Sequence, residues 1–183
     1  MAGLVRIGGR GRLADGSIVT WSVAEGRRGR RWREMRAAGG AVVSSLMLET
    51  DPDERFNHME LSTTAGLLTL HPEGDGTIHG NTVGEDGIGH VVGLPWEPDG
   101  LLLVEGSAIA ATAAVAIARG RVGPGGSVSL AAVVVGLDHR LRAGPVTVER
   151  RGADIWQVGD EPALRLDHSG LPILIDGVEW PLE

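Results

Sequence analysis

Short stretches in which apolar and polar residues alternate recur along most of the chain. They are rich in Val, Ile, Leu and Thr, which favour β-strands, and Gly, Asp and Pro separate them. The pattern predicts strands at residues 18–23, 41–49, 55–62, 66–71, 77–83, 88–92, 101–105, 127–135, 146–149, 155–158, 163–166 and 171–175. Strands so short and so regularly spaced indicate an all-β, mostly antiparallel fold. We expect a single-domain β-roll, half-barrel or barrel over residues 1–183.

The dipeptide Asp-Gly marks the predicted turns. It occurs at residues 15–16, 75–76, 86–87, 99–100 and 176–177, beside predicted strands. Asp and Gly tolerate the two positive-φ positions of a type I′ turn, so each dipeptide predicts a tight hairpin.

One segment departs from the strand pattern. Ser107 precedes the alanine-rich sequence AIAATAAVAIAR, and Gly120 follows it. A serine cap, an alanine-rich interior and a C-terminal glycine are typical of a helix. The β-branched residues of the segment also fit a strand in an all-β chain. The sequence favours a helix at residues 107–119, the one substantial helix that we expect.

Residues 55–96 hold four of the six histidines, and their turns allow the strands to be paired. The pairing assumes two-residue turns at residues 63–64, 75–76 and 86–87. Leu70 then lies opposite Asn81, and Val83 lies opposite His90. Alternation places one mostly apolar set of side chains on the inner face. This set is Asn57, Met59, Leu61, Leu68, Leu70, His79, Asn81, Val83, His90 and Val92.

An apolar concave face with a few converging polar groups is typical of a small-molecule pocket. The predicted ligand-binding residues are Asn57, His79, Asn81, His90 and, at the rim, Trp96. The alternative is a sealed core in which the same polar groups bond to one another and to the backbone. Both interpretations depend on register, because a one-residue slip exchanges the two faces of a strand.

A slipped register has its own chemical interpretation. It would bring together His58, Glu60 and His71, two imidazoles and a carboxylate that suit a divalent metal. The chain has none of the short ligand spacings typical of metal sites. We therefore predict no metal and no cofactor. The neighbours Asp138-His139 and Asp167-His168 are expected to be turn residues, because adjacent strand residues point to opposite faces.

Composition and charge exclude several classes of protein. None of the 183 residues is cysteine, which excludes disulfides and thiolate chemistry. The net charge is -7, yet residues 27–36 hold six arginines and one glutamate. An acidic body argues against a nucleic-acid binder. We expect residues 27–36 to be a solvated loop between strands; the alternative is an anion site with Trp32 as a stacking surface.

The longest apolar run, residues 108–118, is too short to cross a membrane, and arginines interrupt the first twenty residues. We expect a cytoplasmic protein without a membrane span.

From Ser107 onward, the order of features resembles the bacterial family of proposed glycolipid-binding proteins. The helix-like segment is followed by GRVGPGGSVSLAAVVVGLDHRLRAG, and the chain closes with PALRLDHSGLPILIDGVEWPLE. Residues 41–50, followed by DPDERFNHMELS, also resemble the family's early strand and turn. The resemblance implies a spiral antiparallel β-roll and a lipid-like or glycosidic ligand. It transfers no binding residue, because the family's Asn-rich middle motif and its late aromatic residues are absent here.

Three functions fit these observations, and we rank binding of an apolar or amphipathic small molecule first. The second is a cofactor-independent isomerase, cyclase or hydratase that acts on a hydrophobic natural product. In that enzyme His79 or His90 would be the general base, since imidazole titrates near neutral pH. The third is a structural or regulatory domain without a ligand, which would show a face closed by packing.

Overall fold

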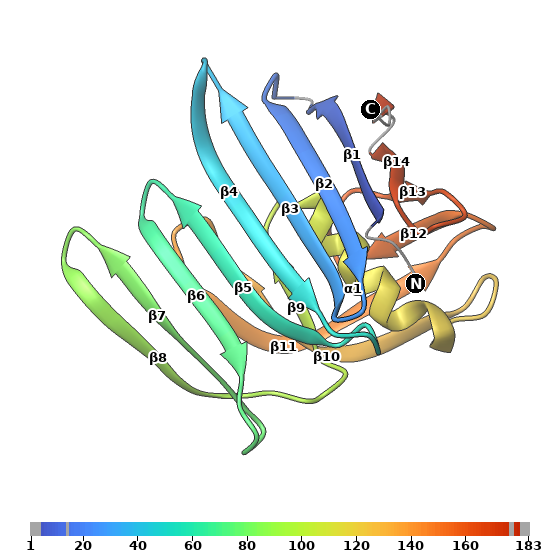
Figure 1. Cartoon of the computed structure of the whole chain (residues 1–183). Coiled ribbons are helices and arrows are strands. Elements are labelled where there is room, and N and C mark those ends of the chain that lie inside the picture. Colours follow the sequence, from blue (N-terminus) through green and yellow to red (C-terminus); the bar gives the residue numbers. More distant parts are fainter. Residues whose placement is uncertain (1–4, 14, 176–177, 180–183) are drawn as a thin grey trace.

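The computed structural model describes residues 5–13, 15–175 and 178–179. These residues form two β-sheets with a helix between them, as Figure 1 shows. Every strand pair is antiparallel except one. The predicted fold class, an all-β curled sheet structure with one substantial helix, is confirmed.

The first sheet is an eight-stranded meander in which each strand pairs with the next along the chain. Its strands are β1 (Val5–Arg12), β2 (Ile18–Gly26), β3 (Gly29–Ala38), β4 (Ala41–Thr50), β5 (Phe56–Thr63), β6 (Gly66–Pro72), β7 (Thr77–Gly84) and β8 (Gly87–Pro95). In Figure 1 this sheet runs from blue to green and curls as it goes. Short turns join neighbours in sequence, so the antiparallel order follows directly from the chain.

The second sheet has the order β15-β14-β13-β12-β11-β10-β9. Its strands are β9 (Leu101–Val104), β10 (Ser127–Val135), β11 (Leu141–Arg150), β12 (Ile155–Val158), β13 (Leu164–Leu166), β14 (Pro172–Ile175) and β15 (Val178–Glu179). β9 and β10 are the parallel pair. Parallel neighbours need a crossover connection, and the helix α1 (Ala108–Ala118) provides it.

The predicted helix at residues 107–119 is confirmed. Ser107 is the N-cap, and its side chain accepts a hydrogen bond from the backbone N–H of Ala110. The C-terminus differs from the prediction, because Arg119 keeps a right-handed conformation and a 3₁₀ turn, Arg119–Arg121, continues the chain past Gly120. Within the described ranges, no helix combines the length and the apolar character needed to cross a bilayer.

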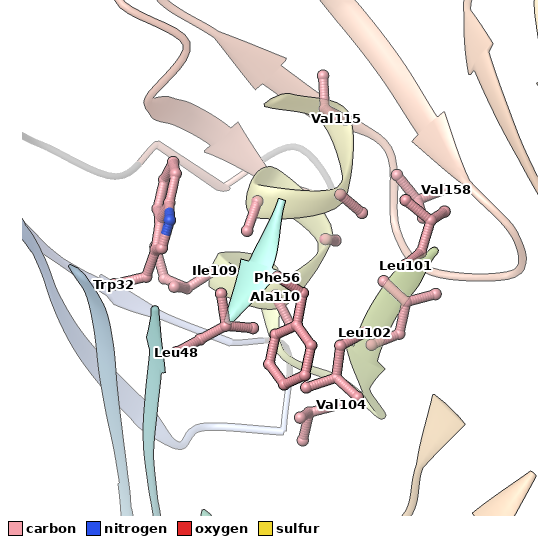
Figure 2. Packing of buried hydrophobic residues seen from close by; sticks show 14 of the residues in the cluster. Trp32, Leu48, Phe56, Leu101, Leu102, Val104, Ile109, Ala110, Val115 and Val158 are labelled. Carbon is pink, nitrogen blue, oxygen red and sulfur yellow. The ribbon is translucent and has the colours of Figure 1, made fainter. Parts of the chain in front are cut away.

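Helix α1 is apolar on every side, because it packs between the two sheets. It contacts β3 of the first sheet and β9, β11, β12, β13 and β14 of the second. In Figure 2, Trp32 and Leu48 of the first sheet lie on one side of Ile109, and Leu101 and Val158 lie on the other side of the helix. Trp32 and Ile109 are completely buried. The apolar residues of both sheets and the helix form one continuous core.

The predicted register of the meander is wrong at all three turns. Thr63 pairs with Gly66 and Val83 with Ile88, so the first and third turns shift the pairing by two residues, which keeps each side chain on its face.

The turn between β6 and β7 shifts the pairing by one residue. The chain makes a three-residue turn there, with Glu73 bonded to Thr77 and the backbone N–H of Gly76 donating to the carbonyl of Glu73. Gly76 has a φ of +80°, typical of a turn that ends in a bulge. Leu70 therefore lies opposite Gly80 and not opposite Asn81.

This slip of one residue turns the side chains of β7 and β8 over. His79, Asn81 and His90 lie on the face away from the core, where Asn81 and His90 are exposed. Asn57 is also exposed, because a β-bulge opposite Glu49 and Thr50 points Phe56 inward in its place. The predicted convergence of these four polar residues on the inner face is wrong.

Among the described residues, the sequence pattern missed three strands: β1, β3 and the two-residue β15. The arginine-rich segment, expected as a loop, forms the turn before β3 and most of that strand. Its side chains alternate, so Trp32 and Glu34 are buried while Arg31 and Arg33 are exposed. The arginine charges had concealed a strand whose inward positions carry a tryptophan and a glutamate.

Candidate functional site

The predicted site residues on the outer face form one contact. The imidazole Nδ1 of His90 lies 2.8 Å from the amide Oδ1 of Asn81, its neighbour across β7 and β8. His79 lies opposite His71 on β6 and is half-buried. Asn57 is separated from this group by β6. The four residues therefore do not enclose a common space.

Trp96 is buried, with 8% of its surface exposed, and its ring packs edge-on against Phe56 at 5.2 Å. It also borders an open depression of about 450 Å³ against β10 and β11. The lining of this depression includes neither His79 nor His90.

The alternative metal set does not assemble. His58 Nε2 lies 3.2 Å from Glu60 Oε1, while His71 lies 3.0 Å from Glu73. Among the described side chains, no three histidine, aspartate or glutamate residues are arranged to hold a metal ion.

Three of the six arginines of residues 27–36 pair with carboxylates on neighbouring strands and loops. Arg30 lies 3.0 Å from Glu25, Arg31 lies 2.5 Å from Glu49, and Arg36 pairs with Asp15. Trp32, the stacking surface of the alternative anion site, is completely buried and so cannot stack on a ligand there.

A hollow lies where α1 ends. We call it the helix-end cavity; its volume is about 710 Å³. Its apolar lining comes from α1 and from strands β12 to β14 of the second sheet. This lining is Val115, Ala116, Trp156, Leu166 and Ile173. Its polar rim comes from the end of the helix and the adjacent turns. These residues are Arg119, Arg150, Asp154, Asp167 and His168.

The sequence places these groups through two tight turns of the second sheet. At residues 151–155, between β11 and β12, Arg150 donates from Nε to the carbonyl of Gly152 and from Nη2 to that of Ala153, at 3.2 and 2.8 Å. Its guanidinium lies 5.4 Å from the ring centre of Trp156, within the range of a cation–π contact. The tryptophan and the turn thus hold the arginine at the rim.

The second turn, between β13 and β14, confirms the prediction for Asp167. Its carboxylate accepts hydrogen bonds from the backbone N–H groups of Ser169 and Leu171, at 2.8 and 2.9 Å. Gly170 has a φ of +79°, and a Cβ there would lie 3.1 Å from a guanidinium nitrogen of Arg119. A glycine at this position therefore lets Arg119 lie against the turn.

The opposite end of α1 holds a buried carboxylate. Glu34 is 6% exposed, and its Oε2 accepts hydrogen bonds from Ser107 Oγ at 3.0 Å and from the backbone N–H of Ile109 at 3.1 Å. Burial raises its pKa to about 7, although these hydrogen bonds and the charge of Arg36 act in the opposite direction. Because the helix occupies this oxygen, we assign Glu34 to holding α1 against the first sheet.

Comparison with known proteins shows the fold. The chain is similar to a DUF1089 family protein from Pseudomonas aeruginosa. The two structures have a TM-score of 0.54 and 17% sequence identity, over 97% of this chain and 91% of the other. No protein-family model matches the chain, and no curated protein matches it. The similarity extends over both sheets and the helix, so it supports the fold as a whole.

Sequence reasoning missed the helix-end cavity and most of its residues. Asp167 lies in a turn, as predicted for Asp167-His168, and Trp156 belongs to the buried core. No local pattern showed that these residues lie beside the end of α1, which precedes them by several tens of positions in the chain. One local signal was present: Arg119 and Arg121 follow an apolar helix, and cations there complement the helix dipole.

Proposed function

We propose that the protein binds an apolar or amphipathic small molecule in the helix-end cavity. The observation that carries this proposal is a hollow of about 710 Å³ with an apolar floor and a polar rim. Its volume lies within the usual range for ligand pockets, and a few charged groups at the mouth would orient a ligand. Trp156 on β12 and Ile173 on β14, with β13 between the two strands, offer it an apolar surface.

The apolar floor supports the lipid-like part of the ligand expected from the family resemblance. A glycosidic part would need free hydrogen-bonding groups. At the rim, Asp167 is occupied by backbone N–H groups and Asp154 by Arg165, at 2.6 Å. We therefore propose a ligand that is mainly hydrocarbon. The cytoplasmic location and the absence of a nucleic-acid partner stay predictions.

The enzyme alternative depended on His79 or His90 in an inner pocket. Both lie on the outer face of the first sheet, and neither lines the helix-end cavity. The imidazole at this cavity belongs to His168. Binding without catalysis is thus the function that the geometry supports best.

Titration with N-phenylnaphthylamine, an uncharged dye that fluoresces in apolar surroundings, tests the proposal. We expect saturable binding by the wild type. Ala116→Phe should abolish it, because residue 116 lines the floor and a phenyl group would fill the space. Gly120→Phe is a second blocking variant, since Gly120 also lines the cavity and a Cβ at this position would meet nothing within 4 Å.

The matched control is Ala143→Phe, which places the same ring in the depression beside Trp96. It should bind the dye as the wild type does. Absence of saturable binding to folded wild type, or equal loss in all three variants, would overturn the assignment to the helix-end cavity. Circular dichroism shows whether each variant is folded.

A further inference from the structure

The charges around the helix-end cavity do not follow those of the whole chain. The protein has a net charge of -7, yet the rim carries two arginines, Arg119 and Arg150. The acidic side chains beside them are already engaged. Arg165 pairs with Asp154, and this hydrogen bond lowers the pKa of the aspartate. The rim therefore balances two arginines with two aspartates, but both carboxylates are already occupied, Asp167 by backbone N–H groups and Asp154 by Arg165.

Arg150 is held in place without being neutralised. The partners that the structure describes for it are two backbone carbonyls and the indole of Trp156, all uncharged. Its Nε and Nη2 make the carbonyl contacts, which leaves Nη1 for another acceptor. A guanidinium with a fixed position loses little conformational entropy when it binds an anion.

Arg119 is only partly neutralised. Its Nη2 lies 3.5 Å from Glu54 Oε1, and the same oxygen lies 3.3 Å from Nη1 of Arg30. One carboxylate thus serves two guanidinium groups. The other terminal nitrogen of Arg119 lies over Gly170, on the cavity side of the residue.

From these contacts, and resting on the proposed function above, we infer that the ligand is a single-chain amphiphile with an oxyanion head group. Arg150 and Arg119 hold the head at the rim, and the hydrocarbon chain lies along Ala116, Trp156 and Ile173. Guanidinium groups bind carboxylate and phosphate oxygens through paired hydrogen bonds, so both head groups fit this chemistry. An uncharged head group would leave the guanidinium of Arg150 with uncharged partners alone.

The test is displacement of N-phenylnaphthylamine by decanoate, decyl phosphate and decanol, which share a ten-carbon chain. We expect both anions to bind the wild type about tenfold more tightly than decanol, the range for hydrogen bonds to charged groups. The preference should shrink as salt is added, because salt screens exposed charges. A preference for one anion over the other identifies the head group as carboxylate or phosphate.

Arg119→Gln and Arg150→Met should each weaken the binding of the anions by about tenfold. The affinity of each variant for decanol should stay within about twofold of the wild-type value. Arg150 also supports a turn, so Arg119→Gln provides an independent test. The control is Arg142→Gln, which removes an equal charge from an exposed residue paired with Glu105, outside the cavity lining. This variant should bind all three compounds with the wild-type affinity.

Equal binding of the anions and decanol by the wild type would overturn the oxyanion assignment while leaving the cavity as a binding site. So would anion affinities that neither arginine variant changes. If the dye itself does not bind, the proposed function fails first. The two failures are therefore distinguishable.

Discussion

Ser107 Oγ donates a hydrogen bond to Glu34 Oε2 at 3.0 Å and accepts one from the backbone N–H of Ala110 at 3.1 Å. The first contact joins β3 of the first sheet to the N-cap of α1, across 73 positions of sequence. Helix N-termini leave unpaired N–H groups, and here a serine and a buried glutamate satisfy two of them. This pair therefore ties α1 to the first sheet and fixes where the helix begins.

Stability should fall as pH rises from about 5 to 8, because the pKa of Glu34 is raised to about 7 in the folded protein. The folded state holds this proton more tightly than the unfolded state, whose pKa is near 4.5. The contribution of Glu34 to the free energy of unfolding is therefore complete below the unfolded pKa. Up to about 3 kcal/mol of it is lost as Glu34 ionises at higher pH.

Glu34→Gln should flatten this dependence, measured as the thermal midpoint against pH. Part of the slope will remain, because burial also raises the pKa of the neighbouring Glu161. Glu85→Gln, in an exposed turn, should keep the wild-type slope. Identical slopes in wild type and Glu34→Gln would contradict the assignment.

Ser107→Ala should lower the free energy of unfolding by about 1–2 kcal/mol, since it removes the cap of α1 and a hydrogen-bond donor to Glu34. Urea unfolding measures the change. Ser62→Ala, an exposed serine on β5, should change it by less than about 0.5 kcal/mol. A Ser107→Ala variant as stable as Ser62→Ala would mean that the cap is dispensable.

Gly80→Ala tests the observed register. A Cβ at Gly80 would lie 1.8 Å from the carbonyl oxygen of Thr69, so β6 and β7 would have to separate. We expect a loss of about 3 kcal/mol or more, as for other severe backbone clashes. Gly74→Ala is the matched control, because nothing lies within 4 Å of a Cβ there. Wild-type stability of Gly80→Ala would rule out this pairing.

Ile109→Ala should cost about 2–5 kcal/mol, because a completely buried side chain between the two sheets would leave a cavity. Ile117→Ala removes the same atoms from a half-buried position on the same helix and should cost less than half as much. If chemical denaturation shows equal losses of unfolding free energy for the two variants, α1 is not more tightly packed at Ile109 than at Ile117.

The strands and the helix could be predicted because their signals are local. The segment Ser107–Arg119 carries a cap and an alanine-rich interior, and β10 has the predicted bounds, Ser127–Val135. Strand β3 was missed because its arginines suggested a solvated loop. Their carboxylate partners, such as Glu49 and Asp15, lie on other elements, so no local pattern revealed the pairing.

The candidate site was less predictable than the fold. His79, Asn81 and His90 do share a face, as alternation predicts, and His90 bonds to Asn81. Which face they share depended on a turn that contains three residues and not two. Asp-Gly fits both turns, and the choice between them exchanges the inside and the outside of every later strand in the meander.

The sequence by itself determined the all-β class, the place of the helix and the positions of most strands, because alternation, turn residues and helix caps act between near neighbours. Tertiary structure alone decided the register of β7, the burial of Glu34 and the placement of Arg119, Trp156 and Arg150 around one cavity. These depend on packing between segments far apart in the chain. Local patterns specify that successive side chains of a strand point to opposite faces. The fold of the whole molecule specifies which face is buried and which distant residues lie against it.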